Sequence, residues 1–125
     1  MSTVYEYSVL RVVPSIERGE SINVGLLVYC RALDFLGCRT HLDVPRLRAF
    51  APTLDLEGVR LALDAVEALC CGGERAGQAG SESAGRRFRW LTAPRSTIVQ
   101  PGPVHPGLTD DPAAELDRLA GLLIH

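Results

Sequence analysis

The residues best suited to chemistry are concentrated in one segment, from Tyr5 to Tyr29. They combine cationic, anionic and amide side chains with one small residue, and they are Arg11, Arg18, Glu20, Asn23 and Gly25. Guanidinium groups bind planar or anionic ligands through paired hydrogen bonds, and a glycine lets a ligand approach the backbone closely. The same groups could instead satisfy one another, with Arg11 or Arg18 paired to Glu20. The pattern indicates a candidate ligand or partner site, with an internal ion pair as the alternative.

A second polar group lies nearer the C-terminus. The members that we expect to share in binding are Trp90, Arg95, Ser96 and His105. A serine and a histidine can form a nucleophile and its base, but the chain contains no G-x-S-x-G turn. His105 also has no evident partner as an acid–base group. No catalytic residue is therefore assigned.

Several cofactor chemistries are absent from the sequence. All thirteen basic residues are arginine, which excludes a Schiff-base lysine and a P-loop lysine. The four cysteines form no C-x-x-C pair, and the histidines have no ligand spacing. We therefore expect no metal and no cofactor. Cys30 and Cys38 could face each other across a hairpin centred on Asp34, and we expect both to stay reduced.

The chain of 125 residues has the length of one domain, and we expect a single domain over residues 1–125. It contains no apolar run near the roughly 18 residues of a spanning helix. Its start also lacks the plan of a signal peptide. These features predict a cytoplasmic protein that does not enter a membrane.

Arginines surround Trp90, at positions 86, 87, 89 and 95. Such basic–aromatic mixtures bind single-stranded nucleic acid through stacking and phosphate contacts. The net charge of −2 gives no sign of a nucleic-acid surface. Single-strand binding around Trp90 is therefore an alternative hypothesis, and nucleic acid is not the expected partner.

Apolar patterning places these residues on strands and helices. The predicted strands occupy residues 4–13, 22–31, 35–42 and 96–100. The first two are apolar on both faces, as in a central strand, and Gly25 marks a bulge or a close approach. The predicted helices occupy residues 44–50, 55–71 and 112 onward, each preceded by an aspartate N-cap or beginning with one.

The segment 72–87 contains only Gly, Ala, Ser, Glu, Arg and Gln, and it is predicted to be a flexible surface loop. Several strands together with two helices that carry apolar stripes predict an α+β fold of two layers. We expect a mainly antiparallel sheet of about 4–6 strands, with the two main helices packed on one face.

The pattern R-x-x-P-x-x-x-R-G-E-x-x-N-x-G over residues 11–25, with segments 35–43 and 90–112, is similar to the bacterial family of unknown function DUF3037. The resemblance extends over nearly the whole chain and departs mainly in segment 72–87. The all-arginine composition is similar to that of actinobacterial members. The resemblance implies no particular activity and no catalytic residue. It implies gene neighbours that encode HipA-like kinases, and hence a role as a small partner or regulator of such a kinase.

Two main functional hypotheses follow. The first is a non-catalytic binding module that acts on a protein partner or forms a homodimer. The second is an enzyme for a phosphate-bearing or nucleotide substrate, in which Arg18 and Arg95 hold the anion. Glu20 or His105 would then act as the acid–base group, which requires all four side chains to converge in one pocket. The binding module is the function that we predict.

Overall fold

Three long antiparallel strands form the centre of the structure, a computed structural model that describes residues 2–95 and 97–125. They are β1 (Thr3–Val12), β2 (Ile22–Cys30) and β3 (Phe35–Thr40). Their order is β3-β2-β1, and two short strands pair with the remaining edge of β1. These are β4 (Val99–Pro101) and β5 (His105–Thr109). β4 lies beside the C-terminal part of β1 and β5 beside its N-terminal part.

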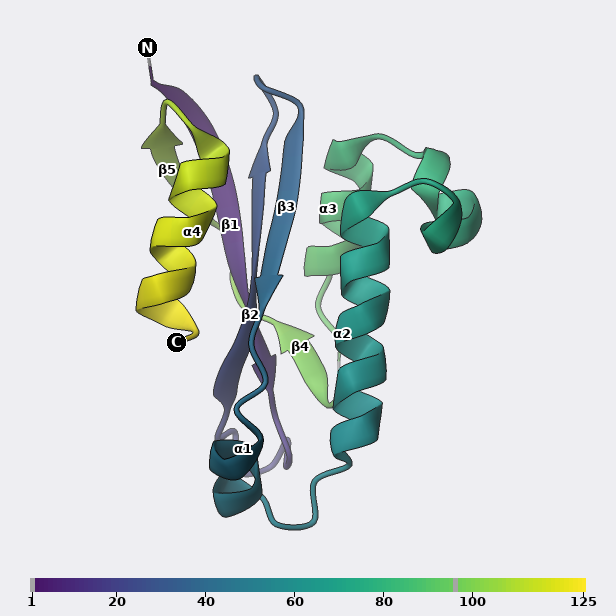
Figure 1. Cartoon of the computed structure of the whole chain (residues 1–125), viewed down its shortest axis with the longest axis vertical. Coiled ribbons are helices and arrows are strands. Elements are labelled where there is room, and N and C mark those ends of the chain that lie inside the picture. Colours follow the sequence, from purple (N-terminus) through teal and green to yellow (C-terminus); the bar gives the residue numbers. More distant parts are fainter. Residues whose placement is uncertain (1, 96) are drawn as a thin grey trace.

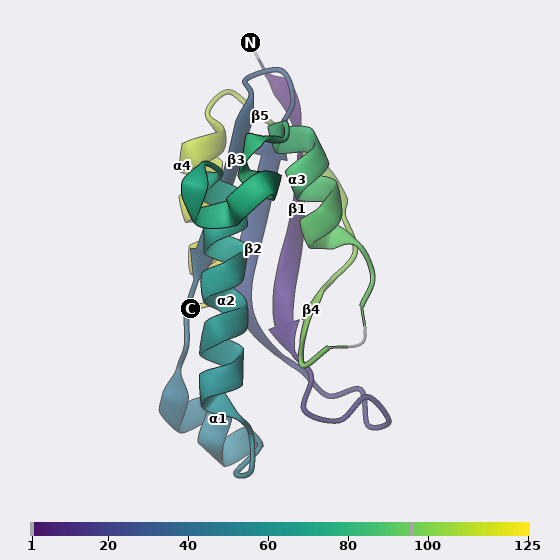
Figure 2. The ribbon, with the colours of Figure 1, turned by 90° about the vertical axis from the view of Figure 1, so that its right-hand side faces the viewer.

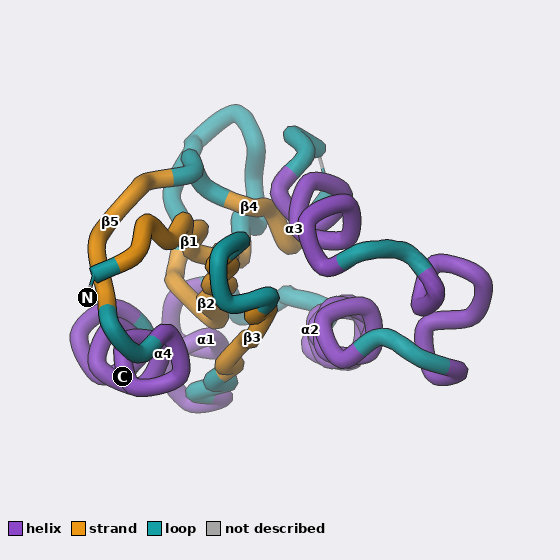
Figure 3. The backbone as a smooth tube through the Cα atoms, turned by 90° about the horizontal axis from the view of Figure 1, so that it is seen from above, coloured by secondary structure: helices purple, strands orange, loops and turns teal. Residues whose placement is uncertain are grey.

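Helices cover both faces of this sheet. They are α1 (Val44–Phe50), α2 (Leu56–Cys71), the 3-10 helix η1 (Glu74–Ser81), α3 (Ala84–Thr92) and α4 (Pro112–Leu123). Helices α2 and α3 lie over one face, and α4 lies over the other (Figure 1, Figure 3). Figure 2 shows α2 and α3 next to each other in front of the strands. Within the described ranges, no helix combines the length and the apolar character needed to cross a membrane.

The predicted α+β class with one antiparallel sheet is confirmed. The prediction that the main helices share one face of a two-layer fold is wrong. In β2, Leu27 and Tyr29 belong to the core under α2 and α3, whereas Leu26 and Val28 belong to the core under α4. A strand with two apolar faces has to be covered on both, and the helices therefore divide between the two sides.

A β-bulge interrupts the pairing of β1 with β2, as Gly25 predicted. Leu10 pairs with Gly25 and Arg11 pairs with Asn23, so β2 contributes one extra residue, Val24. A Cβ atom on Gly25 would lie 3.0 Å from Leu10 Cδ1. The extra residue reverses the alternation of faces along the remainder of β2.

Aspartates begin three helices, as predicted. Asp43, Asp55 and Asp111 each accept a hydrogen bond from the backbone N–H three residues further on. Pro112 follows the last of these in the first turn of α4. Gly72 ends α2 with a φ of +74°, a conformation that glycine adopts without strain.

The glycine-rich segment 72–87 contains more regular structure than predicted. It includes η1, and α3 already begins at Ala84. Arg87, which was placed in the loop, donates from Nη1 to the carbonyl oxygens of Leu69 and Cys70 at 2.9 and 2.8 Å. This guanidinium satisfies the end of α2 and holds α3 against it. The flexibility of the segment stays a prediction.

The C-terminal strands also differ in position from the prediction. The strand expected at residues 96–100 lies at Val99–Pro101, and the proline-rich passage after it contains β5. Pro106 pairs with Glu6 of β1. Proline is tolerated there because an edge strand has no further partner that needs its N–H.

A hydrogen-bonded network ties α4 to the sheet. The Tyr5 hydroxyl on β1 donates to Glu115 Oε2 at 2.6 Å, and Arg118 Nη2 donates to the same oxygen at 3.0 Å. The hydrogen bonds from Arg118 and Tyr5 lower the pKa of Glu115 to about 2. Burial, with the hydrogen bond to the Glu115 carboxylate, raises the pKa of Tyr5 to about 12.

Cys30 and Cys38, which could have faced each other across the hairpin, lie apart. Cys30 pairs with Phe35 and packs under α4, whereas Cys38 pairs with Leu27 and packs under α2. The neighbour of Cys38 is Cys70 on α2. A hydrogen bond between these two thiols lowers the pKa of Cys38 and raises the pKa of Cys70.

Mild oxidation is expected to join Cys38 to Cys70 rather than to Cys30. The two thiols would lose two protons and two electrons to an added oxidant such as hydrogen peroxide. A hydrogen bond of 2.6 Å from Thr40 Oγ1 to Glu67 Oε1 holds β3 against α2 beside this pair. Peptide mass spectrometry in a Cys71→Ser background identifies the linked residues without ambiguity. A peptide that links Cys30 to Cys38 would contradict the expectation.

Candidate functional site

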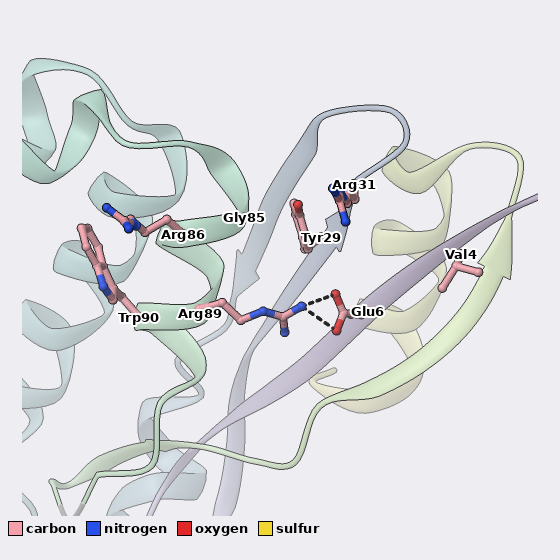
Figure 4. A pocket seen from close by; sticks show the side chains of 8 residues that line it. All are labelled: Val4, Glu6, Tyr29, Arg31, Gly85, Arg86, Arg89 and Trp90. Atoms are coloured by element: carbon pink, nitrogen blue, oxygen red, sulfur yellow. Dashed lines mark hydrogen bonds and ion pairs between the residues drawn. The ribbon is translucent and has the colours of Figure 1, made fainter.

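A pocket of about 640 Å³ opens between α3 and the strands β1 and β2 (Figure 4). Its lining residues are Val4, Glu6, Tyr29, Arg31, Gly85, Arg86, Arg89 and Trp90. They come from three elements and from the turn after β2. The packing of α3 onto the sheet therefore brings together side chains that are up to 86 positions apart in the sequence.

Tyr29 lies at the back of this pocket and is nine-tenths buried. Its ring stacks on Phe88 of α3, with ring centroids 5.2 Å apart. Across the described ranges 2–95 and 97–125, its hydroxyl makes no hydrogen bond. A Cβ atom on Gly85 would lie 2.6 Å from this hydroxyl oxygen. Only a glycine at position 85 lets the hydroxyl approach the first turn of α3.

Three guanidinium groups surround the opening. Arg89 Nη2 donates to both carboxylate oxygens of Glu6, at 3.0 and 2.8 Å. Arg86 has a longer contact of 3.4 Å to Glu82 Oε2. The guanidinium of Arg31 has no hydrogen-bond or ion-pair partner in the part of the chain that the structure describes. Three cations against two carboxylates leave the pocket with an excess of positive charge.

The first turn of α3 adds to this positive character. Ser83 is the N-cap, and its hydroxyl accepts a hydrogen bond from the Arg86 N–H at 3.2 Å. The first N–H groups of a helix have no partner within the helix, and the helix dipole makes this end electropositive. Gly85 belongs to this turn and lines the pocket.

Apolar side chains form part of the rim. Trp90 is 41% exposed and Val4 is 60% exposed, from opposite sides of the pocket. Large apolar side chains beside arginine are typical of surfaces that bind a ligand or a partner.

The residues predicted from the 11–25 segment do not join this pocket. Arg18 and Glu20 form an ion pair with each other on the exposed loop, where they line a separate pocket of about 190 Å³ with Pro14 and Phe50. For Arg18 and Glu20, the structure thus has the internal ion pair that was the alternative to a ligand site. Gly25 pairs with Leu10 next to the bulge already described.

Arg11, Asn23 and His105 meet in a different pocket of about 220 Å³. Asn23 Nδ2 donates to the Leu123 carbonyl at the end of α4 at 3.1 Å. The His105 ring lies 5.3 Å from the ring of Tyr7. These contacts hold the pocket together and leave the Arg11 guanidinium beside the backbone of the β4–β5 connection.

Among the described members of the second predicted group, Trp90 alone lines the large pocket. Arg95 donates from Nη2 to the Trp90 carbonyl oxygen at 2.6 Å and so caps the C-terminal end of α3. Ser96 lies outside the described residues. Arg18, Glu20, Arg95 and His105 are distributed over three separate pockets.

The sequence-based prediction missed Glu6, Tyr29, Arg31 and Gly85 as site residues. A partial signal was present in the arginines around Trp90. Arg86, Arg89 and Trp90 are three and four positions apart, which places them on one face of a helix. Arg87 lies on another face and binds α2. Arg86, Arg89 and Trp90 of the predicted basic–aromatic group therefore line one surface, but it belongs to a pocket that also contains carboxylates.

Fold and pocket together define a small α+β protein with one antiparallel sheet between helices and an arginine-lined pocket at one end. The chain belongs to the family described as "Protein of unknown function (DUF3037)", whose family model matches residues 7–124. The predicted resemblance to this family is confirmed. No curated protein and no solved structure matches the chain.

Proposed function

We propose that the protein is a non-catalytic binding module that holds a protein partner at the arginine-lined pocket between α3 and strands β1 and β2. One observation carries the proposal: Trp90 and Val4 are exposed on the rim of a pocket that presents three guanidinium groups. Tryptophan and arginine are the residue types that most often contribute large binding energies at protein interfaces. Charge complementarity assigns an acidic segment to the partner.

The chemistry of the pocket supports binding rather than catalysis. Guanidinium groups keep their protons at neutral pH, so they hold anions but do not exchange protons with them. Glu6 is the carboxylate among the lining residues, and Arg89 already engages both of its oxygens. A general base has to be free to accept a proton from the substrate. The separation of Arg18, Glu20, Arg95 and His105 likewise weakens the enzyme hypothesis.

Replacing Trp90 by alanine is expected to weaken partner binding by at least about tenfold, because it removes the apolar anchor beside the arginines. Leu122 on α4 is the matched control, since it is an exposed apolar residue on the opposite face of the sheet. The first partner to test is a HipA-like kinase, to which the family resemblance points. Purified wild-type protein and both variants would be compared by biolayer interferometry and by size-exclusion chromatography, which also reports a homodimer.

The proposal fails if Trp90→Ala retains each partner that the wild-type protein captures. It also fails if Leu122→Ala weakens binding as much as Trp90→Ala. Circular dichroism of both variants controls for folding, and an exposed side chain on a helix is expected to change stability by less than about 0.5 kcal/mol.

A further inference from the structure

We propose that the arginine-lined pocket binds a phosphate monoester, with the phosphoryl oxygens received by the Tyr29 hydroxyl, the first turn of α3 and the guanidinium groups of Arg31 and Arg86. This inference rests on the proposed function, since it names the chemical group that the binding module recognises. The organic part of the ligand lies against Trp90.

Tyr29 provides the first argument. Its hydroxyl is held in a nine-tenths buried side chain without a hydrogen-bond partner in the described ranges. The hydroxyl oxygen itself is open to the pocket, because no buried side-chain oxygen or nitrogen of the described residues lacks a hydrogen-bond partner. It therefore presents a hydrogen-bond donor to whatever occupies the pocket. The stacking of the ring on Phe88 fixes the direction of the hydroxyl, which faces the pocket (Figure 4). A ligand oxygen at this position would accept its hydrogen bond in place of water.

The backbone beside Tyr29 provides the second argument. The hydroxyl reaches the N-terminal turn of α3 because residue 85 is a glycine. Helix N-termini bind phosphate because their free N–H groups and their dipole both favour an anion. The hydroxyl and the helix end therefore present hydrogen-bond donors to the same small volume.

The arginines provide the third argument. Arg31 is unpaired among the described residues, and the contact of Arg86 with Glu82 is long and exposed. The Arg31 guanidinium can therefore turn toward a ligand, and Arg86 can do so by giving up its long contact with Glu82. Arg89, in contrast, is engaged by both oxygens of Glu6. The chain as a whole carries a net charge of −2, so this local excess of cations is a property of the pocket.

The number of donors distinguishes a phosphate from a carboxylate. A tyrosine hydroxyl, a helix N-terminus and two guanidinium groups offer more donors than the two oxygens of a carboxylate can use. A phosphate monoester carries three acceptor oxygens and close to two negative charges at neutral pH. It matches the donor set, and its charge is met by the guanidinium groups of Arg31 and Arg86.

Trp90 supplies the readout, because it is the single tryptophan of the chain and lines the pocket. Phenyl phosphate is expected to change the Trp90 fluorescence in a saturable manner, whereas phenylacetate binds at least about tenfold more weakly. Tyr29→Phe and Arg31→Ala are each expected to weaken phenyl phosphate binding at least about fivefold. Arg46→Ala is the matched control, since Arg46 is an exposed arginine on α1, at the other end of the molecule (Figure 1).

The source of the phosphate is distinguished with two further probes. Tighter binding of N-acetyl-phosphoserine amide than of adenosine monophosphate assigns the group to a phosphorylated partner protein, and the reverse order assigns it to a nucleotide. Both results support the inference. It is overturned if phenyl phosphate gives no saturable change, if phenylacetate binds equally well, or if Arg46→Ala has the same effect as Arg31→Ala.

These results are separable from those of the partner experiment. If no phosphate probe binds while Trp90→Ala still abolishes partner capture, the binding module stands and the phosphate assignment falls. If phenyl phosphate binds through Tyr29 and Arg31 while partner capture does not depend on Trp90, the pocket is a small-ligand site and the partner proposal falls. Thermal melting of Tyr29→Phe and Arg31→Ala confirms that a loss of binding is not a loss of folding.

Discussion

Replacing Phe88 by alanine is expected to lower the free energy of unfolding by about 3–5 kcal/mol. Phe88 is fully buried in the core between α3 and the sheet, and its ring stacks on that of Tyr29. The substitution removes the largest of the three buried side chains of α3, the others being Ala84 and Leu91, and leaves a cavity between α3 and the sheet. Because domains of this size are stable by only about 5–15 kcal/mol, the variant is expected to be close to unfolding.

Urea denaturation followed by circular dichroism measures this difference. Trp90→Ala is a suitable control, because Trp90 lies two positions further along α3 and is partly exposed. Its substitution is expected to cost much less, since it leaves no closed cavity. Similar losses for the two variants would show that α3 does not pack on the sheet as described.

The second prediction concerns the dependence of stability on pH. The folded-state pKa of Glu115 lies near 2, below its ordinary value of 4.5. Protonation of this carboxyl is therefore harder in the folded state than in the unfolded one. Its contribution to stability is fully present above about pH 4.5 and is lost as the pH falls toward about 2.

Tyr5 gives the opposite dependence at high pH. Its folded-state pKa is raised from 10 to about 12, so the unfolded state loses the proton first as the pH rises. Stability is expected to decline between about pH 10 and about pH 12. The same pair of residues thus limits stability at both extremes of pH.

Glu115→Gln is expected to cost about 1–2 kcal/mol at neutral pH, because it removes the charge from the hydrogen bonds with Tyr5 and Arg118. It should also flatten the acid branch of the stability curve. Tyr5→Phe should flatten the alkaline branch instead. Urea denaturation at a series of pH values measures both effects. An unchanged acid branch in Glu115→Gln would contradict the role assigned to this network.

Local signals were sufficient to predict the central strands and the starts of α1, α2 and α4. The aspartates at positions 43, 55 and 111 were predicted as N-caps and act as N-caps in the structure, because an N-cap depends only on residues within the next turn. The bulge at Gly25 was predictable for a similar reason. The apolar character of both faces of β1 and β2 also contained the information that both faces are covered, although the helices were assigned to one.

The pocket depends on contacts that the sequence does not reveal. Helix α3 has only Ala84, Phe88 and Leu91 as its buried stripe, and the glycine-rich segment before it hides this short pattern. In the sequence, Tyr29 is indistinguishable from the other apolar residues of a central strand. Its role in the pocket depends on the packing of Gly85 against its hydroxyl, which the sequence does not show. Arg18 and Glu20 look distinctive in the sequence, yet they pair with each other on the surface.

The two edges of the sheet differ in their capacity to accept another strand. At one edge, β4 and β5 are short, are separated by residues 102–104, and contain or flank Pro101, Pro103 and Pro106. Proline has no N–H to offer, so this edge is protected against aggregation. At the other edge, β3 contains no proline. Growth of the sheet, whether in an ordered assembly or in a misfolded aggregate, is therefore restricted to the β3 side.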